Sequence, residues 1–360
     1  MTKFVSGRIE IFDKERENQN VVKTLALISF AANLFAQTQP PYSVETVQFG
    51  TAGTHLAGAL TLPAGKPPFP AVLLVGDAGS QDRDETASGH NLELADYLAR
   101  REIAVLRVDK PKAFRSVEEQ TTDALAGIVF LKGRSEIDAK HIGIIGHGHG
   151  GNIAASAALR SRDVAFLVML ATPVLPAAKE IILQNELALR TSGAPTETVD
   201  WRASLLRQML AVVKDEKDPV AAEPKLRALL ARAKASLPDP ILDQAPFTEA
   251  DLKKLNSQET RSYLSHDPAE AFHNLKTPVL ALYAARDFDT PWKENSETLS
   301  AALKSSDNND HEITQIPGVN HLFEKCDLCT PAEYAKLKEP FSPTALQTIA
   351  AWILSHTKLP

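Results

Sequence analysis

Four continuous apolar runs, which alternate with three stretches of helical spacing, constrain the fold of this chain more than any other feature. The apolar runs cover residues 71–75, 103–108, 142–145 and 165–170, and the helical stretches cover 91–100, 117–132 and 152–160. A run that is apolar on both faces predicts a strand covered on both sides, and the intervening helices supply that cover. The pattern therefore predicts an α/β fold with a mostly parallel central sheet flanked by helices.

The rest of the chain extends this pattern and divides it. Alternating residues at 44–49 and 56–62 predict an antiparallel hairpin, and the end of the chain predicts a strand at 278–283, a helix at 294–303, a strand at 312–316 and a closing helix at 343–356. The segment between the two sheet regions contains no buried-strand run and has helical spacing, which predicts an inserted helical cap. We expect an extension at 1–41, a core at 42–172, a cap at 173–272 and the remaining core at 273–360.

A glycine-rich turn joins the third apolar run to the helix that follows it. The pattern G-x-S-x-G, in which two glycines permit a tight strand-to-helix turn and lift a serine above the sheet, is matched at Gly146 and Gly150. The central position holds Gly148 instead of serine. Taken alone, the segment is also compatible with a plain glycine-rich turn. With its surroundings it predicts a nucleophile elbow without a nucleophile.

Further stretches give the elbow a specific context, namely 81–85, 94–101, 103–107, 263–268 and 317–323. With them the chain resembles the bacterial, often exported α/β-hydrolases near the serine aminopeptidase-like and dienelactone-hydrolase-like families. The resemblance covers roughly residues 43–358. It implies an α/β-hydrolase fold and a site of the Ser-His-Asp type that cleaves carboxylic esters or thioesters.

The resemblance also implies which residues complete the site. Asp287 follows a buried strand and is the expected acid, with Asp289 as the alternative. His321, in a turn after the last strand, is the expected base, although a structural loop histidine is the other interpretation. The order of nucleophile position, acid and histidine is that of this fold.

The oxyanion hole is expected to consist of backbone N–H groups. One belongs to His149, and the other comes from the turn after the first buried strand, from Ala78 or alternatively Asp77. Backbone donors do not depend on the side chain at position 148. We therefore expect the oxyanion hole to bind a carbonyl or carboxylate oxygen even without a serine at position 148.

Two other features near the site bear on its chemistry. A metal site at His147, His149 and His321 is the weaker interpretation, because a histidine at position 147 is common in such elbows and points away from the site. The loop 109–115 lacks the arginine and glycines that related enzymes carry there, which indicates a remodelled loop. No phosphate loop, dinucleotide fingerprint or metal-spaced cluster is present, so we expect no cofactor and no metal.

Three hypotheses about function follow from Gly148. An acyl-enzyme cannot form on glycine, so the ester or thioester hydrolysis of the lineage is either lost or takes another route. In the second hypothesis water fills the space of the missing side chain, and the His321–Asp287 pair activates it for slow hydrolysis. In the third the protein is a non-catalytic pseudo-hydrolase. The expected partner is a small acyl or ester molecule, and the sequence predicts neither its identity nor an oligomeric state.

An apolar run at 25–36, preceded by Lys23 and ending in small residues, predicts a signal peptide within 21–36 and hence export. Its depth in the chain suggests a start codon placed too early; the alternative is a buried amphipathic helix in a cytoplasmic protein. The run is too short for a stable membrane span. A net charge of −6 with scattered Lys and Arg argues against nucleic-acid binding.

Two cysteines, Cys326 and Cys329, are the only ones in the chain. Their C-x-x-C spacing predicts a small loop disulfide in an oxidising compartment. A redox motif or a zinc site would need a thioredoxin-like context or further ligands nearby, and neither is visible.

Overall fold

The computed structural model describes residues 40–51, 54–77, 82–84, 89–110, 115–235, 247–330, 333, 336–337 and 339–357. Residues 42–360 form one compact unit. The predicted signal segment 21–36 and Ala78 lie outside the described residues. No helix in the described part is long and apolar enough to cross a membrane.

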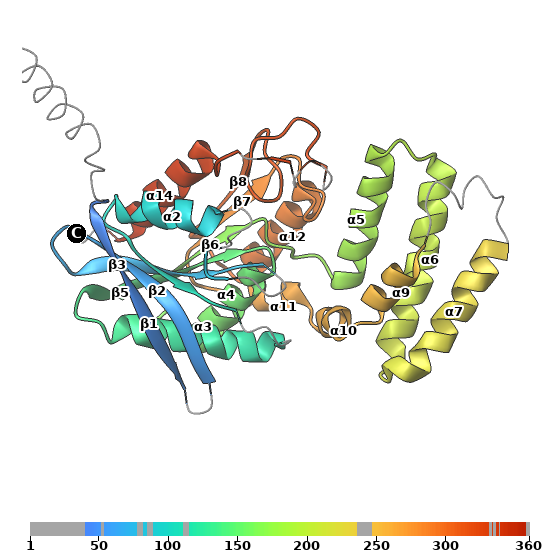
Figure 1. Cartoon of the computed structure of the whole chain (residues 1–360), viewed down its shortest axis with the longest axis horizontal. Coiled ribbons are helices and arrows are strands. Elements are labelled where there is room, and N and C mark those ends of the chain that lie inside the picture. Colours follow the sequence, from blue (N-terminus) through green and yellow to red (C-terminus); the bar gives the residue numbers. More distant parts are fainter. Residues whose placement is uncertain are drawn as a thin grey trace, which may run out of the picture. The chain divides into compact units, whose positions relative to one another are not determined.

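Eight strands form one sheet in the order β1-β2-β4-β3-β5-β6-β7-β8 (Figure 1). The strands are β1 Tyr42–Thr51, β2 Thr54–Pro63, β3 Phe69–Val75, β4 Ala104–Val108, β5 Ile137–His147, β6 Phe166–Leu170, β7 Val279–Ala284 and β8 His311–Ile316. The β1–β2 and β2–β4 pairs are antiparallel, and the remaining pairs are parallel. The predicted mostly parallel sheet is confirmed.

Helices cover both faces of this sheet. They are α2 His90–Ala99, α3 Val117–Lys132, α4 His149–Arg160, α12 Trp292–Ser305 and α14 Pro343–Thr357. One apolar cluster joins α3, α4 and α12 to one face, and a second joins α2 and α14 to the other. Strands that are covered in this way must be apolar on both sides, which accounts for the continuous apolar runs.

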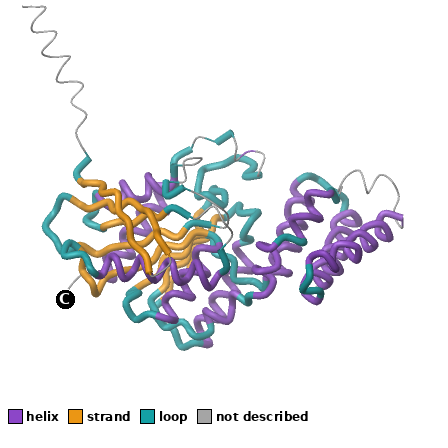
Figure 2. Tube along the Cα trace, turned by 60° about the horizontal axis from the view of Figure 1, so that its bottom comes forward, coloured by secondary structure: helices purple, strands orange, loops and turns teal. Residues whose placement is uncertain are grey.

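A group of helices is inserted between β6 and β7. They are α5 Ala177–Thr191, α6 Thr196–Asp215, α7 Pro219–Ala235, α9 Glu249–Leu255, α10 Gln258–Ser265 and α11 Pro268–Phe272. Figure 2 shows most of them grouped together at one end of the unit. Leucines of α6, α7 and α9 form an apolar cluster separate from the two sheet clusters. The insertion thus has a core of its own.

Strand β5 begins five residues before the apolar run that predicted it. In its first part Ile137 is buried, whereas Ala139 and Lys140 are exposed and Asp138 and His141 are half-buried. This part pairs with β3 only at Ile137, where the register is irregular. The polar start of β5 therefore escaped a search for continuous apolar residues.

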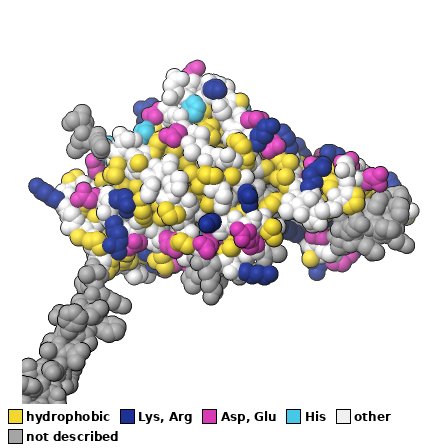
Figure 3. Space-filling view, turned by 90° about the horizontal axis from the view of Figure 1, so that it is seen from above, with side chains coloured by type: hydrophobic (Ala, Val, Ile, Leu, Met, Phe, Trp, Pro, Cys, Tyr) yellow, Lys and Arg dark blue, Asp and Glu magenta, His cyan; other side chains and the backbone are white. Residues whose placement is uncertain are grey.

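The surface mixes charges of both signs. Figure 3 shows Lys and Arg interspersed with Asp and Glu on the face it displays. Ion pairs among the described residues include Arg160 with Glu118 and Lys132 with Asp163. That face offers no concentrated basic patch of the kind that binds a phosphate backbone.

Candidate active site

The site is built at the carboxyl ends of the parallel strands, where ligands bind in open α/β sheets. Strand β5 ends at His147, and helix α4 begins two residues later at His149. Between them Gly148 has φ 52° and ψ −124°, a conformation that residues with a side chain rarely adopt. Its N–H donates to the carbonyl of Leu170 at 2.8 Å, which ties the turn to β6. The strained turn of a nucleophile elbow is therefore present.

His321 and Asp287 contact each other beside this turn. Nδ1 of His321 lies 2.8 Å from Oδ2 of Asp287, and both residues are buried. The other oxygen of Asp287 accepts hydrogen bonds from the backbone N–H groups of Asp289 and Thr290, each at 2.8 Å. The loop after β7 thus orients Asp287, and Asp289 contributes its backbone to that loop.

His147 supports the loop that carries His321. Its Nε2 lies 3.0 Å from the backbone carbonyl of His321, and the two rings are 4.8 Å apart. This contact accounts for a histidine at position 147 without a metal. Among the described residues, Asp287, Asp289 and His321 place ligand-type atoms near one another. The atoms of Asp287 and His321 are already engaged in the hydrogen bonds given above.

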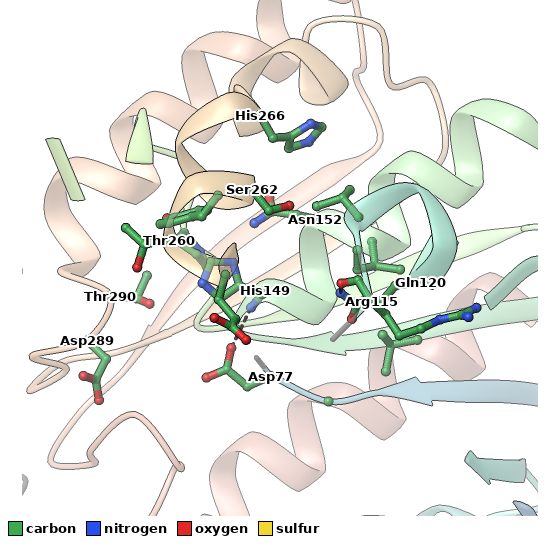
Figure 4. A pocket seen from close by; sticks show the side chains of 18 of the residues that line it. Asp77, Arg115, Gln120, His149, Asn152, Thr260, Ser262, His266, Asp289 and Thr290 are labelled. Carbon is green, nitrogen blue, oxygen red and sulfur yellow. Dashed lines mark hydrogen bonds between the residues drawn. The ribbon is translucent and has the colours of Figure 1, made fainter. Parts of the chain in front are cut away.

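The carboxylate of Asp77 occupies the space that a side chain at position 148 would take. Its Oδ1 accepts a hydrogen bond from the N–H of His149 at 2.9 Å, and its Oδ2 lies 3.4 Å from Nε2 of His321. A Cβ atom built on Gly148 would lie closer than 3.0 Å to both oxygens, which real Cβ atoms essentially never do. Figure 4 shows Asp77 next to His149, with the hydrogen bond dashed.

This arrangement corrects one expectation and changes another. The space beside Gly148 holds a protein carboxylate, so the predicted water does not have that place in this structure. Asp77 was proposed as a backbone donor of the oxyanion hole, but here its side chain accepts from the other expected donor, His149. Ala78, the first choice for that backbone donor, lies outside the described residues. Sequence patterns alone gave no sign that the Asp77 side chain points at position 148.

The negative charge of Asp77 and the positive charge of His321 stabilise each other. Burial would raise the pKa of Asp77, but the hydrogen bond and charge of His321 outweigh it and hold that pKa far below its usual range. Burial would lower the pKa of His321, but Asp287 and Asp77 raise it well above its usual range. In this conformation the two carboxylates therefore favour the imidazolium form of His321.

Lys110 fixes the backbone that carries Asp77. Its Nζ donates to the carbonyl oxygen of Gly76 at 2.8 Å and also to that of Asp77. The neighbouring Asp109 pairs with Arg83, which reaches the carbonyl of Gly58 as well. Lys110, in the loop that begins at Asp109, thus holds the backbone of Asp77 in the site.

A cavity of about 620 Å³ lies between the sheet and the helical insertion, in front of Asp77 and His321. Helix α10 contributes Thr260 and Ser262, and His266 directly follows it; Figure 4 shows all three opposite Asp77. Tyr263, also on α10, packs edge-on against the ring of His149 with centroids 4.4 Å apart. The Tyr263 hydroxyl and Nε2 of His266 are buried without a hydrogen-bond partner among the described residues. The wall formed by α10 therefore offers polar groups to a ligand.

Cys326 and Cys329 form a disulfide in the segment that follows His321. The backbone N–H of Cys326 donates to the carbonyl of Gly318 at 3.3 Å. The disulfide thus closes a small loop that is linked to the turn before His321.

Comparison with known proteins places the chain in a family. Residues 14–207 match the model of the FrsA-like esterases. The chain belongs to the FrsA-like esterase family. The matched residues include Asp77 and Gly148 and end before Asp287 and His321.

One curated relative and two solved structures show the breadth of this similarity. The chain is 26% identical to esterase EstD of Thermotoga maritima over 311 residues, which are 83% of this chain and 65% of EstD. EstE1, a carboxylesterase cloned from a metagenomic library, has 18% identity and a TM-score of 0.54, covering 96% of this chain and 98% of EstE1. An esterase from Pyrobaculum calidifontis has 18% identity and a TM-score of 0.53, covering 95% and 90%. The predicted α/β-hydrolase fold and esterase lineage are confirmed.

Proposed function

We propose that this FrsA-like chain hydrolyses carboxylic esters by direct attack of water, without a covalent acyl-enzyme. The observation that carries the proposal is the 2.8 Å contact between His321 and Asp287, with Nε2 of His321 directed at the elbow and its N–H donor. Asp287 fixes the tautomer of the ring, so Nε2 is the atom that exchanges a proton with water. Gly148 offers no atom for acylation.

An ester can use the site only after the Asp77 side chain has moved. The carbonyl oxygen would take the hydrogen bond from the N–H of His149 that Asp77 now accepts. When the Asp77 carboxylate swings away, one of the two charges that keep His321 protonated is removed, and the imidazole becomes available as a base. Because this step precedes catalysis, hydrolysis is expected to be slow.

The substrate is proposed to be a small acyl ester, with a thioester as the variant that the same chemistry admits. A volume of about 620 Å³ accommodates a ligand of ordinary metabolite size. Within the described part of the chain, the Tyr263 hydroxyl and Nε2 of His266 have no hydrogen-bond partner, and both favour a substrate with hydrogen-bonding groups beyond the ester itself.

A non-catalytic role in ligand binding is the second candidate. The observation in its favour is that Asp77 engages both His149 and His321, the two groups that an ester would need. A pseudo-hydrolase of this kind binds an acyl ligand in the cavity and releases it unchanged.

Hydrolysis of p-nitrophenyl butyrate distinguishes the two. The proposal predicts slow linear turnover without a burst, no labelling by a fluorophosphonate, and loss of turnover in His321→Ala. His356→Ala, which changes a histidine on α14 outside the cavity, is the matched control and should retain the parent rate. If His321→Ala is as fast as the parent, direct water attack is refuted. Saturable binding of butyrate esters without turnover supports the second candidate.

We also propose that the protein is exported through the 21–36 segment. The support is the short apolar run with a basic residue before it and small residues after it. N-terminal sequencing of protein recovered outside the cytoplasm tests this. A chain found only in the cytoplasm and starting at Met1 refutes it.

A further inference from the structure

We propose that Asp77 is a catalytic nucleophile and that this site opens epoxides through an ester formed on the Asp77 carboxylate. This activity goes beyond ester hydrolysis and does not depend on it. The two activities use Asp77 in opposite ways, since an ester needs its carboxylate out of the site and an epoxide needs it in place.

The position of the carboxylate is the first argument. Asp77 lies where a side chain on Gly148 would lie, above the elbow and beside His321. Oδ1 is held by the N–H of His149 at 2.9 Å, which leaves Oδ2 as the attacking atom on the side of His321. Lys110 holds the backbone of Asp77, and Asp77 itself is 30% exposed at the cavity. A carboxylate that is anchored, ionised and accessible is suited to nucleophilic attack.

The chemistry of a carboxylate selects the electrophile. When a carboxylate adds to an alkyl ester carbonyl, the intermediate expels the carboxylate again, because it is a better leaving group than an alkoxide. Attack on a saturated carbon has no such return path once the bond to the leaving group has broken. An epoxide supplies a saturated carbon, and ring strain drives the opening.

The first step balances within the site. Oδ2 of Asp77 forms a bond to an epoxide carbon, the C–O bond of the ring breaks, and its electron pair goes to the ring oxygen. That oxygen takes up the proton carried by His321, so the products are a hydroxyalkyl ester of Asp77 and a neutral imidazole. Tyr263 lines the same cavity, and its hydroxyl has no hydrogen-bond partner among the described residues. In the proposed step this hydroxyl donates to the ring oxygen and polarises it.

The second step regenerates the enzyme. Neutral His321 removes a proton from water, the resulting hydroxide attacks Cγ of Asp77, and the negative charge develops on the oxygen held by the N–H of His149. The intermediate then expels the diol as an alkoxide, which takes the proton from the new carboxyl group. Asp77 is again a carboxylate and His321 again an imidazolium.

The electrostatics of the site favour this order of acid and base. While Asp77 is ionised, it and Asp287 keep His321 protonated, as the first step requires. Formation of the ester removes the charge of Asp77. Only Asp287 then supports the proton, so the pKa of His321 falls and the ring can act as a base in the second step.

Single-turnover hydrolysis of styrene oxide by excess full-length protein in oxygen-18 water tests the proposal. The expected result is a diol carrying an unlabelled oxygen from Asp77, together with one oxygen-18 atom in the peptide that contains Asp77. The peptides containing Asp123 and Asp251, carboxylates that line the same cavity, serve as internal controls and should stay unlabelled. Oxygen-18 in the diol but not in Asp77 means direct attack of water and overturns the proposal.

Three variants and one further substrate complete the test. His321→Gln should accumulate the ester on Asp77, visible by mass spectrometry of the intact protein, because the second step lacks its base. Asp77→Asn should abolish both diol formation and the oxygen-18 labelling of the peptide that contains position 77, and continued diol formation would overturn the proposal. The position of the oxygen-18 label reports on the epoxide reaction alone, so failure here is distinct from failure of the ester proposal. Tyr263→Phe should slow ring opening at least about tenfold. Benzyl bromide, which offers a saturated carbon without an epoxide ring, is the further substrate. If oxygen-18 enters Asp77 during its hydrolysis while styrene oxide is not turned over, the assignment to epoxides is overturned.

Discussion

Introducing a serine at position 148 is the most informative perturbation, because the structure predicts that this change alone does not give an active serine esterase. Gly148→Ser places a side chain at φ 52°, which costs about 1–3 kcal/mol. Its Cβ would also overlap the Asp77 carboxylate, and overpacking of this kind costs about 1–3 kcal/mol. We expect the free energy of unfolding to fall by roughly 2–6 kcal/mol. Asp77 would also still separate the new hydroxyl from His321.

Combining this change with Asp77→Gly removes the overlap. The double variant keeps only the backbone strain and frees the N–H of His149 for a substrate carbonyl. We expect burst kinetics with p-nitrophenyl butyrate, labelling by a fluorophosphonate, and turnover at least about 100-fold faster than that of Gly148→Ser. Stopped-flow absorbance and denaturant unfolding measure these effects.

The matched control combines Gly148→Ser with Asp289→Gly. It removes a carboxylate from the same cavity but leaves Asp77 in place. It should behave like Gly148→Ser alone. If Gly148→Ser is already as stable and as reactive as the double variant with Asp77→Gly, Asp77 does not occupy the serine's space and the reasoning is refuted.

Three further predictions concern charge. Burial raises the pKa of Glu180 to about 8, so between pH 4.5 and 8 the folded protein keeps a proton that the unfolded chain has lost. Stability should therefore fall as the pH rises from about 4.5 to about 8. Glu180→Gln should flatten this pH dependence, as measured by thermal unfolding. Lys110→Met removes the Nζ hydrogen bonds to Gly76 and Asp77 and should cost about 1–3 kcal/mol in denaturant unfolding; an unchanged midpoint contradicts the anchoring role. Asp77→Asn should lower the pKa of His321, measured by NMR titration, and an unshifted titration would falsify their pairing.

The fold was largely predictable because its signals are local. Helix α3 has the predicted bounds, and a capping box between Ser116 and Glu119 marks its start. Helix α4 begins three residues before the predicted start at 152, since Gly150 within it argues against a helix. The reason for this glycine is tertiary: a Cβ there would overlap the carbonyl of Val75 on the neighbouring strand.

The candidate site was predictable only where residues follow the order of the fold. Asp287 and His321 each follow a strand at a characteristic place, so the sequence indicates them even though 34 positions separate them. Asp77 was noted for its backbone alone, because the pattern of the loop after β3 concerns N–H groups. Which way its side chain turns depends on Lys110 and on the absence of a side chain at Gly148, and neither effect is local in sequence.

The Asp77 carboxylate occupies the space that a side chain at position 148 would need. This overlap changes how a glycine at position 148 is interpreted. If the space beside Gly148 were open, loss of the hydroxyl would leave a weakened esterase with room for water. A carboxylate in that space instead engages the oxyanion donor and keeps His321 protonated, so ester hydrolysis is opposed at two points. The same carboxylate has the anchoring and ionisation that a nucleophile needs. The chemistry of this site therefore depends on Asp77 more than on the residue at position 148.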